Sequence, residues 1–401
     1  MSRLWEKGLP LDQRVLRYTA GEDHLLDARL LAYDVRASIA HAEMLAEQKL
    51  LTAADCEAIC DGLRRLESEF EGGEWHIELQ DEDVHTALES RLTAAIGPTG
   101  GRLHLGRSRN DQVLTAMRLY LRDACGQVTA SVQNLCTAMA ALSSAQGHIA
   151  LPGTTHMQHA MPSSVALWSG GFLEGFQDAV AGLGAARRRI DKNPLGSAAG
   201  YGTPGLPIDR ASTTGKLEFA ETQSPVTAVQ LSRGKAESGL LFEIALFMQD
   251  LGRLASDLLL YYTQEFGYVE LAPEVTTGSS IMPQKRNPDV LELVRAATAT
   301  VQACLDECLM ITAKLPSGFQ RDLQRLKPPV FRAVDLAIES ADVMAYLIGG
   351  LRFREENIEL DDSLNAAEEA YDLVTSRGIP FREAYREVAK KYVSQALCDG
   401  E

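Results

Sequence analysis

Residues 240–260 read LLFEIALFMQDLGRLASDLLL. From Leu240, apolar residues recur at steps of three and four through Ile244, Phe247 and Leu251, which is the spacing of one helix face. Further leucines occupy the other faces, so the segment is apolar almost all round. A helix of this kind is buried on every side. We therefore expect it to lie at the centre of a helical bundle, where a partner subunit helps to cover it.

The spacing of prolines also predicts long helices, because an interior proline costs a helix about 3 kcal/mol. The segment after Val113 carries a second stripe of apolar residues at helical spacing, and no long stretch alternates as a strand does. The sequence therefore predicts an all-α fold. The long windows without proline are 11–97, 99–151, 226–272, 289–315 and 330–379.

We expect three domains: an N-terminal helical domain (1–106), a central bundle of long helices (107–349) and a short C-terminal helical domain (350–401). The Gly/Pro-rich stretch 193–209 is expected to be a structured loop, and 273–288 a second loop.

Composition and charge argue against several classes of function. The net charge of −16 argues against a general nucleic-acid or anionic-membrane surface. No apolar run is long enough to span a membrane, and the first residues show no apolar signal region, so we expect a cytoplasmic protein. The seven cysteines are odd in number and lack the ligand spacing of a zinc site, which favours buried free thiols and predicts no metal.

The sharpest motif is Gly278-Ser279-Ser280-Ile281-Met282-Pro283-Gln284-Lys285-Arg286-Asn287-Pro288. It gathers hydroxyl, amide and cationic groups in a segment that contains Pro283 and ends at Pro288. A polar surface loop is the ordinary interpretation. The apolar Ile281 and Met282 favour a loop that folds over a ligand.

Other motifs leave two interpretations open. Residues 106–112 precede a helix and carry two arginines, which suits either a carboxylate site or a helix cap (Asn110 or Asp111) with solvated arginines. His156, between Pro152 and Pro162, is either a general acid or base or a structural histidine. The acids at 81–83 suit a helix start, and 319–327 a solvated basic turn.

Taken together, the segments at 153–159 and 278–288 resemble the fumarase/aspartase superfamily, whose signature G-S-S-x-M-P-x-K-x-N-P is matched at every fixed position by Gly278–Pro288. Gln284 and the run Ser108-Arg109-Asn110-Asp111-Gln112 are similar to the argininosuccinate lyase family within it. The resemblance extends from about Leu4 to about Val388.

The resemblance implies a carbon–nitrogen lyase (an amidine-lyase). It would reversibly eliminate fumarate from argininosuccinate and leave arginine, the last step of arginine biosynthesis. It also implies a homotetramer with a twenty-helix core and active sites shared by three subunits, without a metal or organic cofactor.

The resemblance also implies residue roles. Ser279 would take the proton, with Gly278 and Lys285 stabilising its oxyanion, because a serine is otherwise a poor base. His156, paired with Glu292, would handle the proton of the leaving group. The remaining substrate-binding residues would be Ser108, Arg109, Asn110, Thr155, His85, Asn287, Arg321, Gln324, Lys327 and Asp27.

The chain departs from the family pattern at Phe319, where a tyrosine is usual, and at Asp23, which replaces a serine. Two alternatives remain: another lyase of the superfamily, or a structural protein that keeps the fold, as lens members of the family do.

Overall fold

The computed structural model describes residues 12–398, so the first residues and their lack of an apolar signal lie outside it. The chain forms two compact units, each built from three stretches of sequence. Unit 1 contains the residues up to Thr129 with Ala181–Leu246 and Thr300–Ala337. Unit 2 contains Ala130–Val180, Phe247–Ala299 and the residues from Ile338 onward. The three-domain division stays a prediction.

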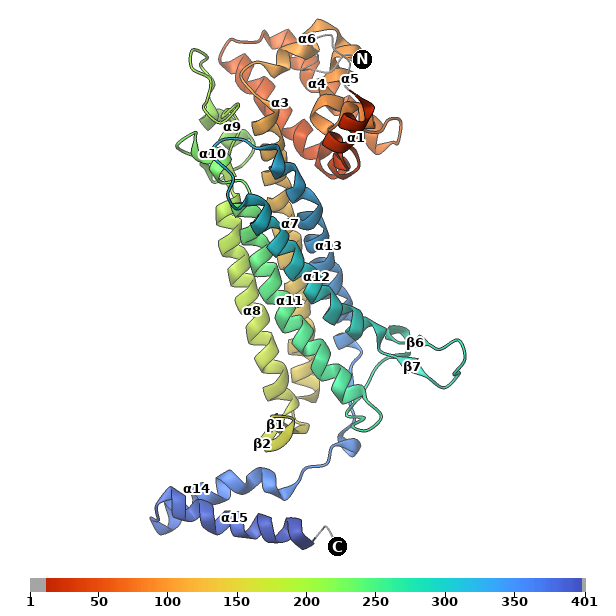
Figure 1. The fold of residues 1–401 in the computed structure, drawn as a ribbon, viewed down its shortest axis with the longest axis vertical. Helices are drawn as coiled ribbons and strands as arrows, with labels where there is room; N and C mark the ends of the chain where they lie inside the picture. Colours follow the sequence, from red (N-terminus) through yellow and green to blue (C-terminus); the bar gives the residue numbers. More distant parts are fainter. Residues whose placement is uncertain (1–11, 399–401) are drawn as a thin grey trace. The chain divides into compact units, whose positions relative to one another are not determined.

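α-Helices make up most of the described chain, which confirms the all-α prediction (Figure 1). Each of the long helices has one part in unit 1 and one part in unit 2. Three of them, α7, α11 and α12, lie inside the proline-free windows that predicted them. The long helices are α7 (Arg109–Gln146), α8 (Val165–Ile190), α11 (Lys235–Tyr262), α12 (Asp289–Thr312) and α13 (Lys327–Gly349).

Two of the long helices differ from the windows predicted from proline spacing. α8 fills the gap between Pro162 and Pro194, a window that the sequence analysis did not single out. α13 begins before its predicted window, because Pro328 and Pro329 lie in its first turn. There a proline is tolerated, since the N–H that it lacks has no partner within the helix.

Unit 1 holds most of the shorter helices. Side-chain caps fix where several of them begin: Asp83, for example, accepts a hydrogen bond from the N–H of Thr86 (2.9 Å) at the start of α5. These helices are α1 (Gln13–Ala20), α2 (Asp23–Leu26), α3 (Leu31–Glu47), α4 (Ala53–Glu71), α5 (Val84–Ile96), α6 (Pro98–Gly101), α9 (Arg210–Lys216) and α10 (Ala228–Leu231). Its 3₁₀ turns are η1 (Asp27–Leu30), η2 (Leu79–Asp81), η3 (Arg102–His104) and η5 (Arg321–Leu326), and its strands β3 (Lys192–Asn193) and β4 (Glu221–Thr222) pair in parallel.

Unit 2 contains the antiparallel pairs of strands. They are β1 (Ala150–Thr155) with β2 (Gln158–Ser164), β5 (Val269–Glu270) with β8 (Arg352–Phe353), and β6 (Thr277–Gly278) with β7 (Arg286–Asn287). Its other short elements are η4 (Pro273–Val275), η6 (Glu355–Asn357), η7 (Asp362–Asn365), α14 (Ala366–Arg377) and α15 (Phe381–Cys398). The last two helices confirm the expected helical tail.

The predicted central helix α11 packs closely against its neighbours in unit 2. The rings of Phe247 and Phe176 of α8 are 5.7 Å apart, and a Cβ added at Gly252 would lie 2.7 Å from Oγ1 of Thr298 on α12. Phe242 and Leu246, in the unit 1 part of α11, stay 50% and 43% exposed. Within one chain, α11 is therefore not buried on every side, in contrast to the prediction.

Two further observations concern the described residues. None of their helices has the length and apolar character needed to cross a membrane. Their cysteines are free thiols; Cys60, Cys125, Cys304 and Cys308 are buried as predicted, while Cys56 and Cys136 are only half-buried. The side chain of Cys398 lies outside the described part.

Candidate functional site

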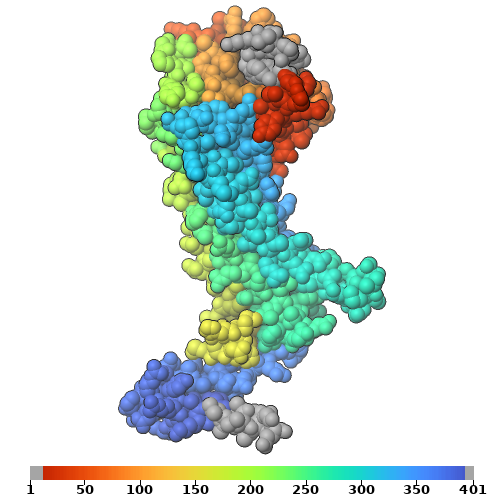
Figure 2. Space-filling view, in the orientation of Figure 1, coloured from red at the N-terminus to blue at the C-terminus, as the bar shows by residue number. Residues whose placement is uncertain are grey.

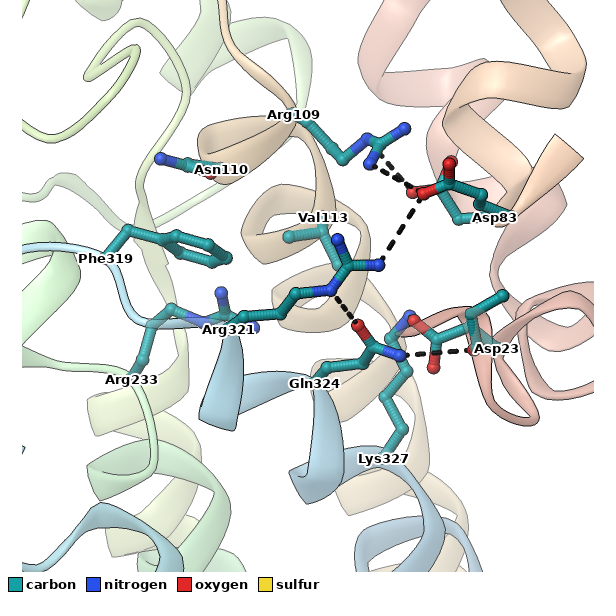
Figure 3. Close-up of a pocket in the computed structure, with 12 residues that line it drawn as sticks. Asp23, Asp83, Arg109, Asn110, Val113, Arg233, Phe319, Arg321, Gln324 and Lys327 are labelled. Atoms are coloured by element: carbon teal, nitrogen blue, oxygen red, sulfur yellow. Dashed lines mark hydrogen bonds and ion pairs between the residues drawn. The ribbon is translucent and has the colours of Figure 1, made fainter. Parts of the chain in front are cut away.

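A pocket of about 170 Å³ lies in unit 1, where the ends of several elements meet (Figure 3). Its walls come from the start of α7, the loop before α5, the start of α2, the loop before α11 and the turn η5. The lining mixes four cations with three carboxylates. The residues are Ala20, Asp23, Glu82, Asp83, Arg109, Asn110, Val113, Arg233, Phe319, Arg321, Gln324 and Lys327.

Lys327 forms the most deeply buried contact of this pocket. Its Nζ lies 2.6 Å from Oδ1 of Asp27 and 3.0 Å from Oδ2 of Asp23. Burial alone would lower the pKa of Lys327, but the two carboxylates outweigh it and leave the pKa raised. Burial also raises the pKa of Asp23 to about 6, although Lys327 opposes that shift. Asp23, which stands where the family usually has a serine, is thus one partner of a buried ion pair with Lys327.

Arg109 is held by the loop before α5. Its Nε lies 3.1 Å from Oδ2 of Asp83 and its Nη2 donates to Oγ1 of Thr86 (2.7 Å). Burial would raise the pKa of Asp83, but His85 and Arg109 reverse the shift and leave it lowered. Asp83 therefore caps α5 and orients Arg109 with the same carboxylate.

His85 lies behind this wall and does not line the pocket. Its Nδ1 is 3.0 Å from Oδ2 of Asp34, and the side chain is 3% exposed. Burial would lower the pKa of His85, but Asp34 and Asp83 outweigh it and leave the pKa raised. The position suits a residue that supports Asp83.

The turn η5 supplies the opposite wall. Arg321 donates from Nε to Oε1 of Gln324 (3.1 Å) and from Nη2 to the carbonyl of Thr19 (2.8 Å). Gln324 donates to that same carbonyl (3.0 Å). The end of α1 and η5 are thus joined by side-chain hydrogen bonds, some of which Figure 3 marks as dashed lines.

The start of α7 resolves one open interpretation of the sequence. Oγ of Ser108 accepts from the N–H of Asn110 (3.3 Å), and Oδ1 of Asp111 accepts from the N–H of Ser108 (2.8 Å). Ser108 is thus the cap of α7 rather than Asn110 or Asp111, because its hydroxyl accepts the N–H of the second helical residue. Asn110 and Arg109 are left to line the pocket.

In unit 2, the segment around His156 is a β-hairpin, which the sequence analysis did not predict. Thr155 pairs with Gln158, and the two residues between them, His156 and Met157, have φ of 54° and 61°. Positive φ at both central residues defines a tight hairpin turn that usually holds Gly or Asn. The exposed imidazole of His156 is therefore presented at the tip of β1–β2.

The signature segment connects β6 to β7 in unit 2 and projects from its surroundings (Figure 2). Oγ of Ser279 accepts from the N–H of Met282 (3.2 Å) and of Ile281 (3.4 Å). Nδ2 of Asn287 donates to the carbonyl of Gly278 (3.4 Å). The N–H groups that donate to Oγ of Ser279 thus come from residues 281 and 282, whereas the resemblance implied Gly278 and Lys285 for this role.

A wide hollow of about 1260 Å³ lies beside this segment, within unit 2. Lys285, Asn287 and Glu292 line it, together with Arg286 and Arg295. His156 does not line it, and within the described chain no hydrogen bond or ion pair joins His156 to Glu292. Figure 1 shows the β1–β2 and β6–β7 hairpins at different places in unit 2.

The predicted site residues therefore fall into separate groups. Unit 1 holds Asp27, His85, Ser108, Arg109, Asn110, Arg321, Gln324 and Lys327; unit 2 holds Thr155, His156, Ser279, Lys285, Asn287 and Glu292. Asp83 and Arg233 both line the unit 1 pocket, although neither was predicted to bind substrate. Among residues 12–398, no group of three or more His, Cys, Asp or Glu side chains is placed to hold a metal ion.

Comparisons with known proteins agree on one family. A family model described as Lyase matches residues 12–303. An argininosuccinate lyase of Sorangium cellulosum is 44% identical over 389 residues, which cover 96% of this chain and 90% of the relative. One of Thermotoga neapolitana is 39% identical, covering 97% of this chain and 98% of the relative.

Solved structures share the fold. An EDDS lyase in complex with formate has a TM-score of 0.83 at 25% identity and covers 98% of this chain and 78% of its own. A class II fumarase from Schistosoma mansoni has a TM-score of 0.78 at 18% identity, covering 95% and 93%. With the family match and the identity over nearly its whole length, the chain belongs to the fumarase/aspartase superfamily and, within it, to the argininosuccinate lyase family.

Proposed function

We propose that the chain is an argininosuccinate lyase, a carbon–nitrogen lyase that reversibly splits argininosuccinate into fumarate and L-arginine in the last step of arginine biosynthesis. The observation that carries the proposal is the 44% identity to an argininosuccinate lyase over 96% of the chain. It acts in the cytoplasm, without a metal or organic cofactor.

Ser279 takes the proton from the succinyl carbon next to a carboxylate. Its Oγ already accepts N–H groups from residues 281 and 282, and such donors stabilise a serine oxyanion. Negative charge then develops on the neighbouring carboxylate. Lys285, Asn287 and Thr155 bind the succinyl carboxylates. His156, together with Glu292, gives the leaving guanidino nitrogen its proton as the C–N bond breaks.

The unit 1 pocket receives the arginine end. Asn110, Arg109, Arg321 and Gln324 line it, and Lys327 closes its floor against the buried Asp27. Ser108 holds the start of α7, and His85 supports Asp83 from behind. The mixture of fixed cations and carboxylates suits a ligand that carries charges of both signs.

Complete sites form where several copies of the chain meet in a homotetramer with a core of long helices. Two observations support this proposal. Within one chain, His156 and Glu292 line different surfaces of unit 2. Leu293, Leu309 and Met310 of α12 also leave 69%, 49% and 70% of their surface exposed, and apolar exposure of this size favours contact with another copy.

The direct test is fumarate release, followed by its ultraviolet absorbance, from argininosuccinate, adenylosuccinate, malate and aspartate offered separately. We expect strong release from argininosuccinate alone. Release from adenylosuccinate or aspartate instead would show that the chain has another activity of the superfamily. Release from none of the four would favour a structural protein that keeps the fold.

A further inference from the structure

Arg233 lies in the unit 1 pocket, in the short connection between α10 and α11, and neither the signature motifs nor the roles given above include it. Its side chain is only 6% exposed. The guanidinium carbon lies 5.5 Å from the ring centroid of Phe319, within the range of a cation–π contact. Figure 3 shows both side chains pointing into the pocket.

Among the described residues, Arg233 differs from the other cations of the pocket in having no ion-pair partner. Lys327 contacts Asp23 and Asp27, Arg109 contacts Asp83, and Arg321 pairs with Glu82. Nε and Nη1 of Arg233 are shut off from solvent and donate to no acceptor within the described chain. No dashed line reaches Arg233 in Figure 3.

Two carboxylates, Glu237 and then Asp23, act on Arg233 electrostatically, but neither forms an ion pair with it within the described chain. The carboxylate of Glu237 is buried and accepts the N–H of Gly234 (2.8 Å). Burial lowers the pKa of Arg233 to about 10, which still leaves it charged at neutral pH. A charge buried without a partner is costly, and this one faces a pocket.

We propose that the guanidinium of Arg233 binds the α-carboxylate of the arginine portion of the substrate, while the ring of Phe319 supports it from one face. The inference rests on the proposed function and deepens it. The α-carboxylate fits better than a succinyl carboxylate, because the groups that bind the succinyl end belong to unit 2 and this pocket receives the arginine end. A guanidinium and a carboxylate also form strong, directional hydrogen bonds.

The test uses the reverse reaction, in which fumarate is combined either with L-arginine or with agmatine, which is arginine without its carboxylate. Arg233→Met is expected to lower kcat/KM for arginine roughly 10²- to 10³-fold, mainly through KM. With agmatine, kcat/KM is expected to stay close to that of the parent. The preference for arginine over agmatine therefore collapses. Equal losses with both amines would show a structural role and overturn the inference.

Arg118 provides a matched control. It is a buried arginine outside the pocket, and it donates to the carbonyl of Arg189 (2.8 Å) and to Oγ of Ser232 (2.8 Å). Arg118→Gln is expected to lower the unfolding temperature and to affect both amines equally. If it changed the arginine/agmatine preference as much as Arg233→Met does, the assignment to Arg233 would be wrong.

Two further variants keep the inference testable if Arg233→Met folds poorly. Arg233→Lys retains the charge and should recover part of the preference for arginine. Phe319→Leu removes the supporting ring and should raise KM for arginine more than for agmatine. If both variants keep the full preference of the parent, Arg233 does not recognise the carboxylate. Parent protein that releases no fumarate from argininosuccinate defeats the proposed function itself, which the other outcomes leave intact.

Discussion

The unit 1 pocket and the connection between β6 and β7 in unit 2 are built in opposite ways. The pocket is a network of ion pairs, and in the most buried of them Lys327 and Asp27 are 3% and 0% exposed. In the connection, Ile281 is 83% exposed, and Ser279 is held mainly by N–H groups two and three residues further along. The part proposed to bind the arginine end is therefore preorganised, whereas the part that carries the proposed base makes few contacts. The difference predicts that changes in the connection alter turnover, and changes in the pocket alter stability as well.

Ser279→Ala should have the largest effect on activity. Loss of the proposed base is expected to lower kcat for fumarate release by about 10²- to 10⁴-fold, with an unchanged unfolding temperature because the connection is exposed. The neighbouring exposed Ser280 gives the control, since Ser280→Ala removes a hydroxyl from the same connection. If the two variants lose activity equally, or if Ser279→Ala unfolds early, the contrast between the regions breaks down.

Lys327→Met tests the pocket. It leaves Asp23 and Asp27 buried without their cation, which is expected to cost about 3–5 kcal/mol of unfolding free energy. Denaturant unfolding measures the loss. Lys216→Met is the matched control, because Lys216 pairs with Glu43 and Glu47 at the surface and should contribute only about 0–1 kcal/mol. Similar losses in both variants would mean that the pocket is not preorganised as described.

The smallest effect concerns the pH dependence of stability. The pKa of Asp23 is raised to about 6 in the folded protein, above its ordinary value of 3.8. Between about pH 4 and pH 6 the folded state therefore holds a proton that the unfolded chain releases, so this group makes the unfolding free energy fall as the pH rises. Asp23→Asn should remove that slope, measured by unfolding across this pH range. The exposed Asp61→Asn should not, and an unchanged slope in Asp23→Asn would contradict the assignment.

Helix periodicity and proline spacing were sufficient to predict α7, α11 and α12, because each is long and carries its own apolar stripe. The β1–β2 hairpin could not be found in this way. Pro152 pairs with Pro162 across the strands, the strands do not alternate, and the turn residues His156 and Met157 are not typical of a tight hairpin. The local sequence therefore gives no signal for those backbone angles.

Most residues of the candidate site were predicted from contiguous motifs, and the isolated Asp27 only from the family resemblance. The signature segment and the start of α7 were identified from their letters, and their proposed roles stay predictions. Arg233 gave no such signal, because a single arginine before a helix is usually solvated. Only the structure places Arg233 beside Phe319, 86 positions away by the difference of their numbers.

The order in which the pocket is completed has a consequence during synthesis. The pocket needs Ala20 from the first helix and Lys327 from the last of the long ones, so it cannot close until the ribosome has released most of the chain. Ser279 emerges earlier. An interrupted translation product that ends before Phe319 would display the proposed base on its exposed connection while lacking the wall proposed to hold the arginine end. Such a fragment could not supply that wall to a site shared between copies.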